Sequence, residues 1–170
     1  MTDRPARIAG TISDAPGIHF NAIVRKLELA PGQVQYHLKG LIREGVVVAE
    51  PLYGRTHYYR PDYDADERGA IAVLRRETPR DIMFYLLERG PTDPSTVAAD
   101  LDIARSTVEW HLDHLIEQGI VRKQRDSRNR VTLVLTRPTE TVGLLEDIEP
   151  TLAGRFSDRF TRLVDHLLFE

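Results

Sequence analysis

The sequence of 170 residues contains no cysteine. This absence excludes disulfides, thiolate zinc sites, cysteine nucleophiles and thiol-based redox sensing. No apolar run approaches the roughly twenty residues that a membrane-spanning helix needs. The first residues, Met1 to Arg4, also lack the charged-then-apolar order of a signal peptide. We therefore expect a soluble, cytoplasmic protein that does not contact a membrane.

Positive charge is also scarce, because 23 Lys and Arg residues stand against 26 Asp and Glu residues, which makes the net charge −3. Proteins that bind nucleic acid are usually basic, since neutralised phosphates supply much of the affinity. The distribution of charge along the chain must therefore decide whether it can bind nucleic acid. Only Lys26, Lys39 and Lys123 are lysines, so nearly all cations are Arg. This bias resembles the proteome of a salt-loving archaeon, although a GC-rich genome produces much of the same pattern.

The motifs of common enzyme classes are missing as well. The sequence has no glycine-rich phosphate loop, no nucleophile elbow and no convincing metal triad. His111 and His114 are one helical turn apart and could present two imidazoles to a metal, but no third ligand stands nearby. For His37 and His111 we favour a structural role as half-buried, hydrogen-bonded side chains. We expect no enzyme activity, no cofactor and no metal.

What the sequence does contain is an internal repeat. Residues 34–38 match residues 108–112 at an offset of 74 positions, and the match extends in both directions without an insertion. Leu41, Ile42, Gly45 and Val47 fall on Leu115, Ile116, Gly119 and Val121. Chance similarity between amphipathic helices is the alternative, but the unbroken register favours two copies of one domain.

Each copy is predicted to contain a helix, a short strand, two further helices and a hairpin. In the first copy, a helix over 4–14 ends at a Pro-Gly turn, and Asn21 is placed to cap the second helix. Pro31 suits the first turn of the third helix, which ends at Gly45. Two strands within 46–59 then form the hairpin, or wing.

The second copy repeats this plan with its own turn residues. Thr78 and Pro79 open its first helix, which ends at Gly90. Ser106 is placed to cap the third helix, which ends at Gly119. The turn of the second hairpin falls at 126–129.

A helix of the type x-V-x-Y-H-L-x-x-L-x-x-x-G-V followed by a hairpin resembles the winged-helix domains of ArsR-like and MarR-like prokaryotic regulators. The resemblance covers roughly 4–60 and 78–136. It implies a mainly α fold with small β wings, in which two tandem winged helix-turn-helix domains are followed by C-terminal helices. The expected parts are a first domain over 1–61, a linker helix over 62–77, a second domain over 78–137 and a C-terminal helical segment over 138–170.

In a helix-turn-helix domain the third helix lies in the major groove. A helical projection of the first copy places neutral or basic side chains opposite the apolar stripe. The candidate base-reading residues there are Gln33, Gln35, Tyr36, Lys39 and Arg43. An ordinary solvated face is the alternative. The same face of the second copy carries Glu109, Asp113 and Glu117, which would repel phosphates, so we do not expect it to read bases.

The hairpins carry most of the remaining positive charge. The second wing holds the strongest basic cluster, which consists of Arg122, Lys123, Arg125, Arg128 and Arg130. The first wing has a milder version in Arg55, His57 and Arg60. Such clusters suit the DNA backbone or the minor groove. The second wing could instead neutralise the adjacent acidic helix.

After Pro138 apolar residues recur at spacings of three and four, with Pro150 breaking or restarting the helix. The candidate dimerisation residues on this stripe are Leu145, Ile148, Leu152, Phe156, Phe160, Leu163 and Leu167. The stripe either packs back on the second repeat or pairs with its copy in a homodimer. We favour the homodimer, since regulators of this type usually match palindromic sites.

The sequence therefore favours a transcriptional regulator whose partner is double-stranded DNA and whose first repeat reads bases. The alternative is a tandem winged-helix scaffold in a chromosome-organising or other multiprotein complex, which the acidic second helix and the negative net charge favour. The sequence specifies neither the operator nor a small-molecule effector.

Overall fold

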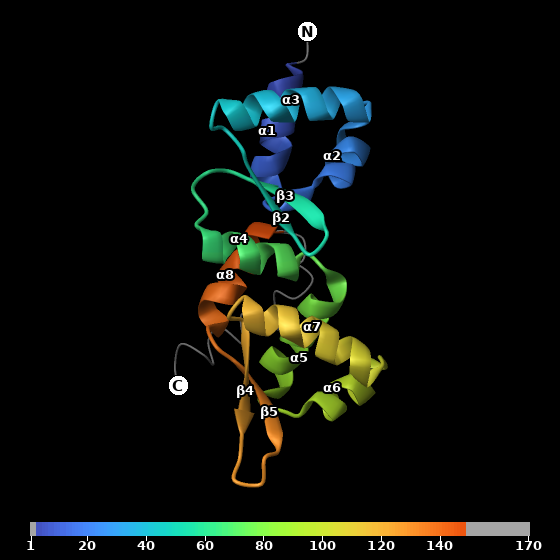
Figure 1. Ribbon diagram of the computed structural model, residues 1–170, viewed down its shortest axis with the longest axis vertical. Coiled ribbons are helices and arrows are strands. Elements are labelled where there is room, and N and C mark those ends of the chain that lie inside the picture. Colours follow the sequence, from blue (N-terminus) through green and yellow to red (C-terminus); the bar gives the residue numbers. More distant parts are fainter. Residues whose placement is uncertain (1–2, 149–170) are drawn as a thin grey trace.

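The computed structural model describes residues 3–148, which form an elongated, mainly helical molecule with two small antiparallel sheets (Figure 1). This architecture confirms the predicted fold class. The first half contains α1 (Arg4–Asp14), β1 (Ile18–His19), α2 (Phe20–Leu27), α3 (Pro31–Arg43), β2 (Val48–Leu52) and β3 (Arg55–Tyr59). The second half contains α4 (Ala65–Leu74), α5 (Glu77–Arg89), α6 (Pro94–Leu101), α7 (Arg105–Glu117), β4 (Val121–Arg125), β5 (Val131–Leu135) and α8 (Pro138–Ile148).

The structure repeats as the sequence does. Helices α2 and α6, and likewise α3 and α7, lie 74 positions apart along the chain. Glu28 and Asp102 both end the second helix of their repeat in the left-handed conformation, at φ 54°. Gly45 and Gly119 have positive φ angles just after the third helix, where glycine costs least. The internal repeat is therefore a repeat of structure.

Two of the predicted helix caps are wrong. Helix α2 begins at Phe20, so Asn21 lies inside its first turn. Helix α7 begins at Arg105, which places Ser106 inside the first turn too. The N-cap residues are His19 and Ala104, and neither side chain forms a capping hydrogen bond. The turn that precedes each helix, and not a capping side chain, therefore determines where the helix begins.

Each repeat closes its hairpin onto the segment before its second helix. In the first sheet the strand order is β1-β3-β2, with Ile18 opposite Tyr58. In the second, β4 pairs with β5, and an isolated bridge joins Thr92 to Leu133 at the place that β1 occupies in the first repeat. The hairpin is thereby held against the helices, and its position relative to the third helix is fixed.

Two apolar cores stabilise the chain. The first packs α1, α2 and α3 around buried residues such as Ile8, Ile23 and Val34. The second contains not only α5, α6 and α7 but also the linker helix α4, which is buried from Gly69 to Leu74, and α8. Tyr59 at the end of β3 also belongs to the second core. The connecting segment therefore packs as an integral part of the second domain, and the two domains share residues at their junction.

Within residues 3–148, none of the helices combines the length and the hydrophobicity that a bilayer span requires.

Candidate nucleic-acid interface

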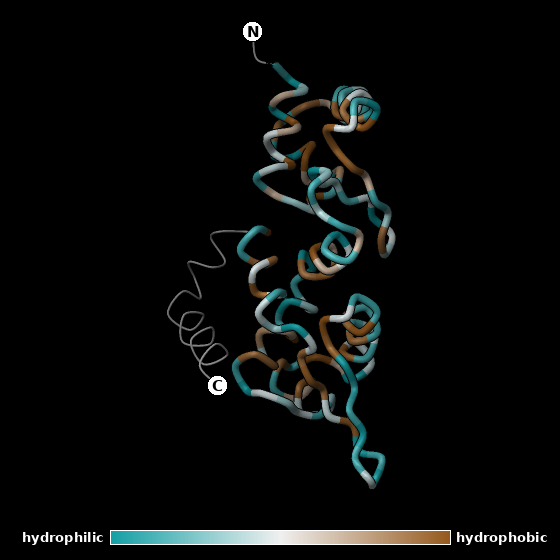
Figure 2. Tube along the Cα trace, turned by 90° about the vertical axis from the view of Figure 1, so that its left-hand side faces the viewer, coloured by the Kyte–Doolittle hydropathy of each residue, from teal (hydrophilic) through white to brown (hydrophobic). Residues whose placement is uncertain are grey.

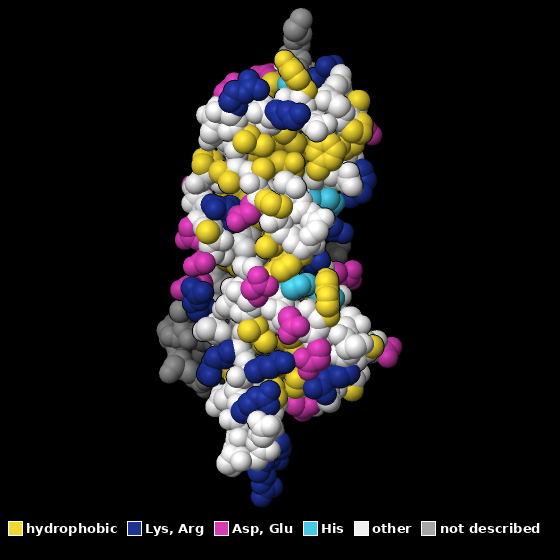
Figure 3. Space-filling model, in the orientation of Figure 1, with side chains coloured by type: hydrophobic (Ala, Val, Ile, Leu, Met, Phe, Trp, Pro, Cys, Tyr) yellow, Lys and Arg dark blue, Asp and Glu magenta, His cyan; other side chains and the backbone are white. Residues whose placement is uncertain are grey.

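Helix α3 buries one stripe and exposes the opposite one. Val34, Leu38 and Leu41 are buried in the first core. Tyr36 is 75% exposed, and the side chains of the candidate base-reading residues Gln35, Lys39 and Arg43 are also exposed. Figure 3 shows Lys and Arg side chains over this upper end of the molecule. The exposed face is thus rich in groups that donate hydrogen bonds.

Helix α3 also stands out as a ridge between two hollows. One, of about 490 Å³, lies between α3 and the first hairpin and is lined by residues that include Gln35, Lys39 and Arg55. The other, of about 470 Å³, lies on the opposite flank beside Tyr36 and Arg43. A helix that protrudes between hollows can enter a groove about 12 Å wide without steric conflict.

Gln33 differs from the other candidates on α3. It is half-buried, and its Oε1 accepts a hydrogen bond from the backbone N–H of Ala30 at 3.4 Å. The same side chain therefore helps to cap the N-terminus of α3, which is a structural task.

In the first wing Arg55 is exposed beside the turn, and its contact with DNA stays a prediction. The prediction for His57 is wrong, because this side chain is 2% exposed and its Nδ1 lies 2.7 Å from the carbonyl oxygen of Gly17. β3 lies between β1 and β2 in the sheet, and its last three residues, from His57 to Tyr59, are all buried. Arg60 follows the end of β3, away from the turn, and forms a 2.6 Å ion pair with Asp62, so its position gives the predicted contact no support.

The tip of the first wing docks on the second domain, which sequence reasoning missed. The ring of Tyr53 stacks on His114 of α7 with 3.8 Å between ring centroids. Its hydroxyl donates to Glu117 Oε2 and accepts from Gln118 Nε2, both at 3.0 Å. Arg76 donates to the backbone carbonyl of Tyr53 at 2.5 Å. The first wing is thus engaged within the chain.

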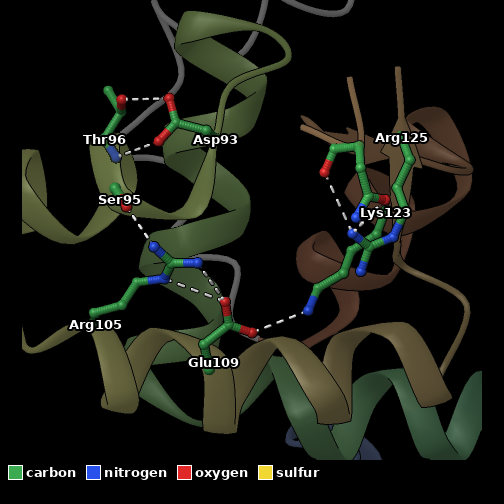
Figure 4. A network of polar contacts seen from close by, with 8 residues as sticks. Asp93, Ser95, Thr96, Arg105, Glu109, Lys123 and Arg125 are labelled. Atoms are coloured by element: carbon green, nitrogen blue, oxygen red, sulfur yellow. Dashed lines mark hydrogen bonds and ion pairs between the residues drawn. The ribbon is translucent and has the colours of Figure 1, made fainter. Parts of the chain in front are cut away.

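Glu109 on the acidic helix α7 is also engaged within the chain. It accepts from Arg105 and Lys123, each at 3.0 Å, and Figure 4 shows it between the two cations. Hydrogen bonds from Lys123 and then Arg105 lower the pKa of this carboxyl group. Lys123 is therefore occupied in neutralising α7, which is the alternative role considered for the second wing.

The histidines of α7 pack against an exposed tryptophan. Trp110 is 51% exposed, and its ring lies edge-on to those of His111 and His114, at 4.8 and 4.3 Å between centroids. Both histidines are half-buried. The hydrogen bond expected for His111 is not found at its buried Nδ1, which has no partner among the described residues. The buried Nδ1 of His114 has no partner there either. Within residues 3–148 no group of three potential ligands could hold a metal ion.

The second wing protrudes from the lower end of the molecule and is largely hydrophilic (Figures 1 and 2). Asp126 shapes its turn by accepting from the backbone N–H groups of Arg128 and Arg130, both at 2.9 Å. Arg125 bonds to Asn129 and Arg130 pairs with Asp126, yet both arginines remain exposed. Arg122 and Arg128 are exposed as well. Four of the five predicted cations thus face solvent.

Helices α3 and α7 lie on the same face of the molecule with roughly parallel axes, and the second wing extends beyond α7 (Figures 1 and 2). A single elongated partner could therefore contact α3 and the second wing from one side.

The candidate dimerisation stripe is divided by the structure. Leu145 and Ile148 are 3% and 2% exposed and belong to the second core, where α8 packs against α4. These two residues pack back on their own chain and offer no surface to a partner. Leu152, Phe156, Phe160, Leu163 and Leu167 lie outside the described residues, so the homodimer remains a prediction.

Two family models match the chain. Residues 2–71 match a family described as an N-terminal HTH domain, and residues 76–123 match the bacterial regulatory protein, arsR family. The prediction of two tandem helix-turn-helix domains, with ArsR-like character, is confirmed. Neither description is that of an enzyme.

The chain is 28% identical over 131 residues to an uncharacterized HTH-type transcriptional regulator of Methanocaldococcus jannaschii. The match covers 77% of this chain and only 33% of that relative, so the chain spans about a third of the relative's length. Among solved structures, an ArsR-like transcriptional regulator from Rhodococcus sp. RHA1 has a TM-score of 0.42 at 24% identity, covering 61% of this chain and 92% of its own. A transcriptional regulator from Thermotoga maritima has a TM-score of 0.39 at 24% identity, covering 60% and 80%.

Proposed function

We propose that the chain is a DNA-binding transcriptional regulator in which α3 reads the major groove and the second wing contacts the backbone or the minor groove. One observation carries the proposal: α3 exposes Gln35, Lys39 and Arg43 on a ridge between two hollows. Gln pairs with adenine, and Lys and Arg with guanine or phosphate. The two helix-turn-helix family matches support the same reading.

The second wing supplies the matching electrostatic contact. Arg122 and Arg128 are exposed, and within residues 3–148 neither takes part in an ion pair. Each phosphate that such a cation neutralises contributes about 0.9 to the slope of log K against log salt. The wing therefore adds affinity that does not depend on sequence, while α3 adds the specificity.

Genome-wide occupancy of the tagged protein tests the function and supplies a binding sequence. Discrete peaks that share a motif are expected. A stoichiometric protein partner with no enrichment of DNA would instead establish the second candidate function, a scaffold, which the exposure of Trp110 on α7 favours.

The residue assignment is then tested by fluorescence anisotropy on that sequence. Lys39→Glu and Arg43→Glu are expected to abolish specific binding, because they place carboxylates against phosphates and base edges. Arg89→Glu, which changes the net charge equally on the exposed end of α5, is the control and is expected to bind normally. Normal binding by the α3 variants would overturn the assignment.

Arg122→Ala and Arg128→Ala test the wing. Each is expected to weaken binding to all sequences alike and to reduce the salt slope by about 1. A change of sequence preference without a change of slope would contradict the proposed role.

A further inference from the structure

A cavity of about 430 Å³ lies at the junction between the two domains. Its volume falls within the range of small-molecule sites, roughly 300–1,000 Å³. The first domain supplies one side from α1, β1, α2 and β3, and the second supplies the other from the α4–α5 junction and the end of α8. The polar and charged lining residues are Asp14, His19, Lys26, Arg55, His57, Arg75 and Arg76.

The lining is strongly cationic in a chain whose net charge is negative. Among the described lining residues, the cations Lys26, Arg55 and Arg76 stand against one carboxylate, that of Asp14. Burial, and then the charge of Arg55, lower the pKa of Arg76. The cavity therefore concentrates positive charge that its own residues do not balance, and an anion entering it would gain electrostatic energy in a partly desolvated place.

Two buried nitrogen atoms of this lining have no hydrogen-bond partner among the described residues. His57 is 2% exposed, and because the carbonyl of Gly17 can only accept, its Nδ1 must donate to it. The other ring nitrogen, Nε2, is buried and unpartnered, and so is Nε of Arg76. Buried polar atoms are nearly always hydrogen-bonded in proteins. Burial lowers the pKa of His57, so its Nε2 carries a lone pair, and of the two atoms only Nε of Arg76 has a hydrogen that an anion can accept.

The same cations link the two domains. Arg75 donates to the carbonyl of Pro16 at 2.6 Å and to that of Ile148 at 3.1 Å. Arg76 donates to the carbonyl of Tyr53, and its guanidinium lies 5.6 Å from the centre of the Tyr53 ring, which stacks on α7. A ligand in the cavity therefore touches the side chains that hold the domains together.

We propose that this cavity binds a small anionic molecule through a carboxylate or phosphate group. Lys26 and Arg55 approach it from the first domain, and Arg76 approaches it from the second. No residue of α3 lines the cavity, and its occupancy does not require DNA.

Isothermal titration calorimetry of the full chain tests the site with two probes in separate arms, inorganic phosphate and benzoate, against potassium chloride at equal ionic strength. Saturable binding of at least one probe, with a Kd of about 1 mM or tighter, is expected. The arm that saturates identifies the class of anion. Lack of saturation in both arms would overturn the proposal.

Matched variants tie any binding to the cavity. Lys26→Gln and Arg55→Gln each remove one lining cation, and we expect each to weaken binding about tenfold, as loss of a charge-assisted hydrogen bond does. Arg25→Gln removes the neighbouring exposed cation of α2, which does not line the cavity, and is expected to leave the Kd unchanged. Equal effects of Arg25→Gln and Lys26→Gln would show general charge attraction and would overturn the site.

Discussion

The docking of the first wing on α7 predicts that Tyr53 couples the two domains energetically. Its ring stacks on His114, and its hydroxyl bonds to both Glu117 and Gln118. Tyr53→Ala removes all of these contacts, whereas Tyr53→Phe removes only the hydroxyl bonds. Because Tyr53 has a positive φ of 49°, alanine and phenylalanine keep nearly the same backbone penalty as tyrosine.

The expected magnitudes follow from the contacts. A ring stack contributes about 1 kcal/mol and each net hydrogen bond about 1 kcal/mol, with a discount here because Tyr53 is only half-buried. Tyr53→Ala should therefore lower the free energy of unfolding by about 2–3 kcal/mol, and Tyr53→Phe by about 1 kcal/mol. A double-mutant cycle with His114→Ala isolates the stack and should show a coupling of about 1 kcal/mol.

Urea unfolding followed by circular dichroism measures these differences. Trp110 is the single tryptophan and packs against His114, so its fluorescence reports the same contact from the side of α7. Tyr36→Ala is the control, because Tyr36 is 75% exposed and its ring lies edge-on to that of His37; a change below about 0.5 kcal/mol is expected. A coupling energy between Tyr53 and His114 indistinguishable from zero would refute the docked arrangement.

Two further predictions concern stability. Gly17 has a φ of 77°, and an added Cβ would lie 2.6 Å from Ile71, so Gly17→Ala should lower the free energy of unfolding by about 2–4 kcal/mol. Gly10 lies in α1, where an added Cβ would meet nothing within 4 Å, so Gly10→Ala should instead raise the free energy of unfolding by about 0.5–1 kcal/mol. Equal urea midpoints for the two variants would contradict both expectations. Burial is the largest cause that lowers four histidine pKa values, those of His19, His57, His111 and His114. The unfolded chain therefore binds protons near pH 6.5 that the folded chain does not, so the urea midpoint should fall as the pH drops from about 7.5 to 5.5, and a constant midpoint would argue against these shifts.

The repeat and the helices were predictable because they depend on local patterns. In α3 and α7, apolar residues at spacings of three and four predict the helix itself, and Gly45 and Gly119 predict where it ends. Neither prediction needs information about distant parts of the chain. The exposure of Lys39 and Arg43 follows from the same projection. Where a helix has a single apolar stripe, helical geometry alone identifies the residues on the opposite face as exposed to solvent.

The roles of the wings could not be read from the sequence, because they depend on contacts between distant segments. His57 looks like an ordinary wing cation, yet pairing of β3 with β1 turns it toward Gly17, 40 positions away. Tyr53 and Glu117 are 64 positions apart. An aromatic residue at a hairpin turn was the available signal, since a large ring seldom occupies such a place unless it packs against something.

These long-range contacts also explain why the two third helices differ in charge. Arg43 of α3 corresponds to Glu117 of α7, and Glu117 binds the first wing through Tyr53. Gln35 corresponds to Glu109, which binds the second wing through Lys123. Two of the three carboxylates on α7 thus serve contacts within the chain, and the acidity of α7 no longer favours a protein partner. Under the proposed function each chain offers one base-reading helix, α3, and we expect a chain to cover one half-site, so that a palindromic operator requires two chains.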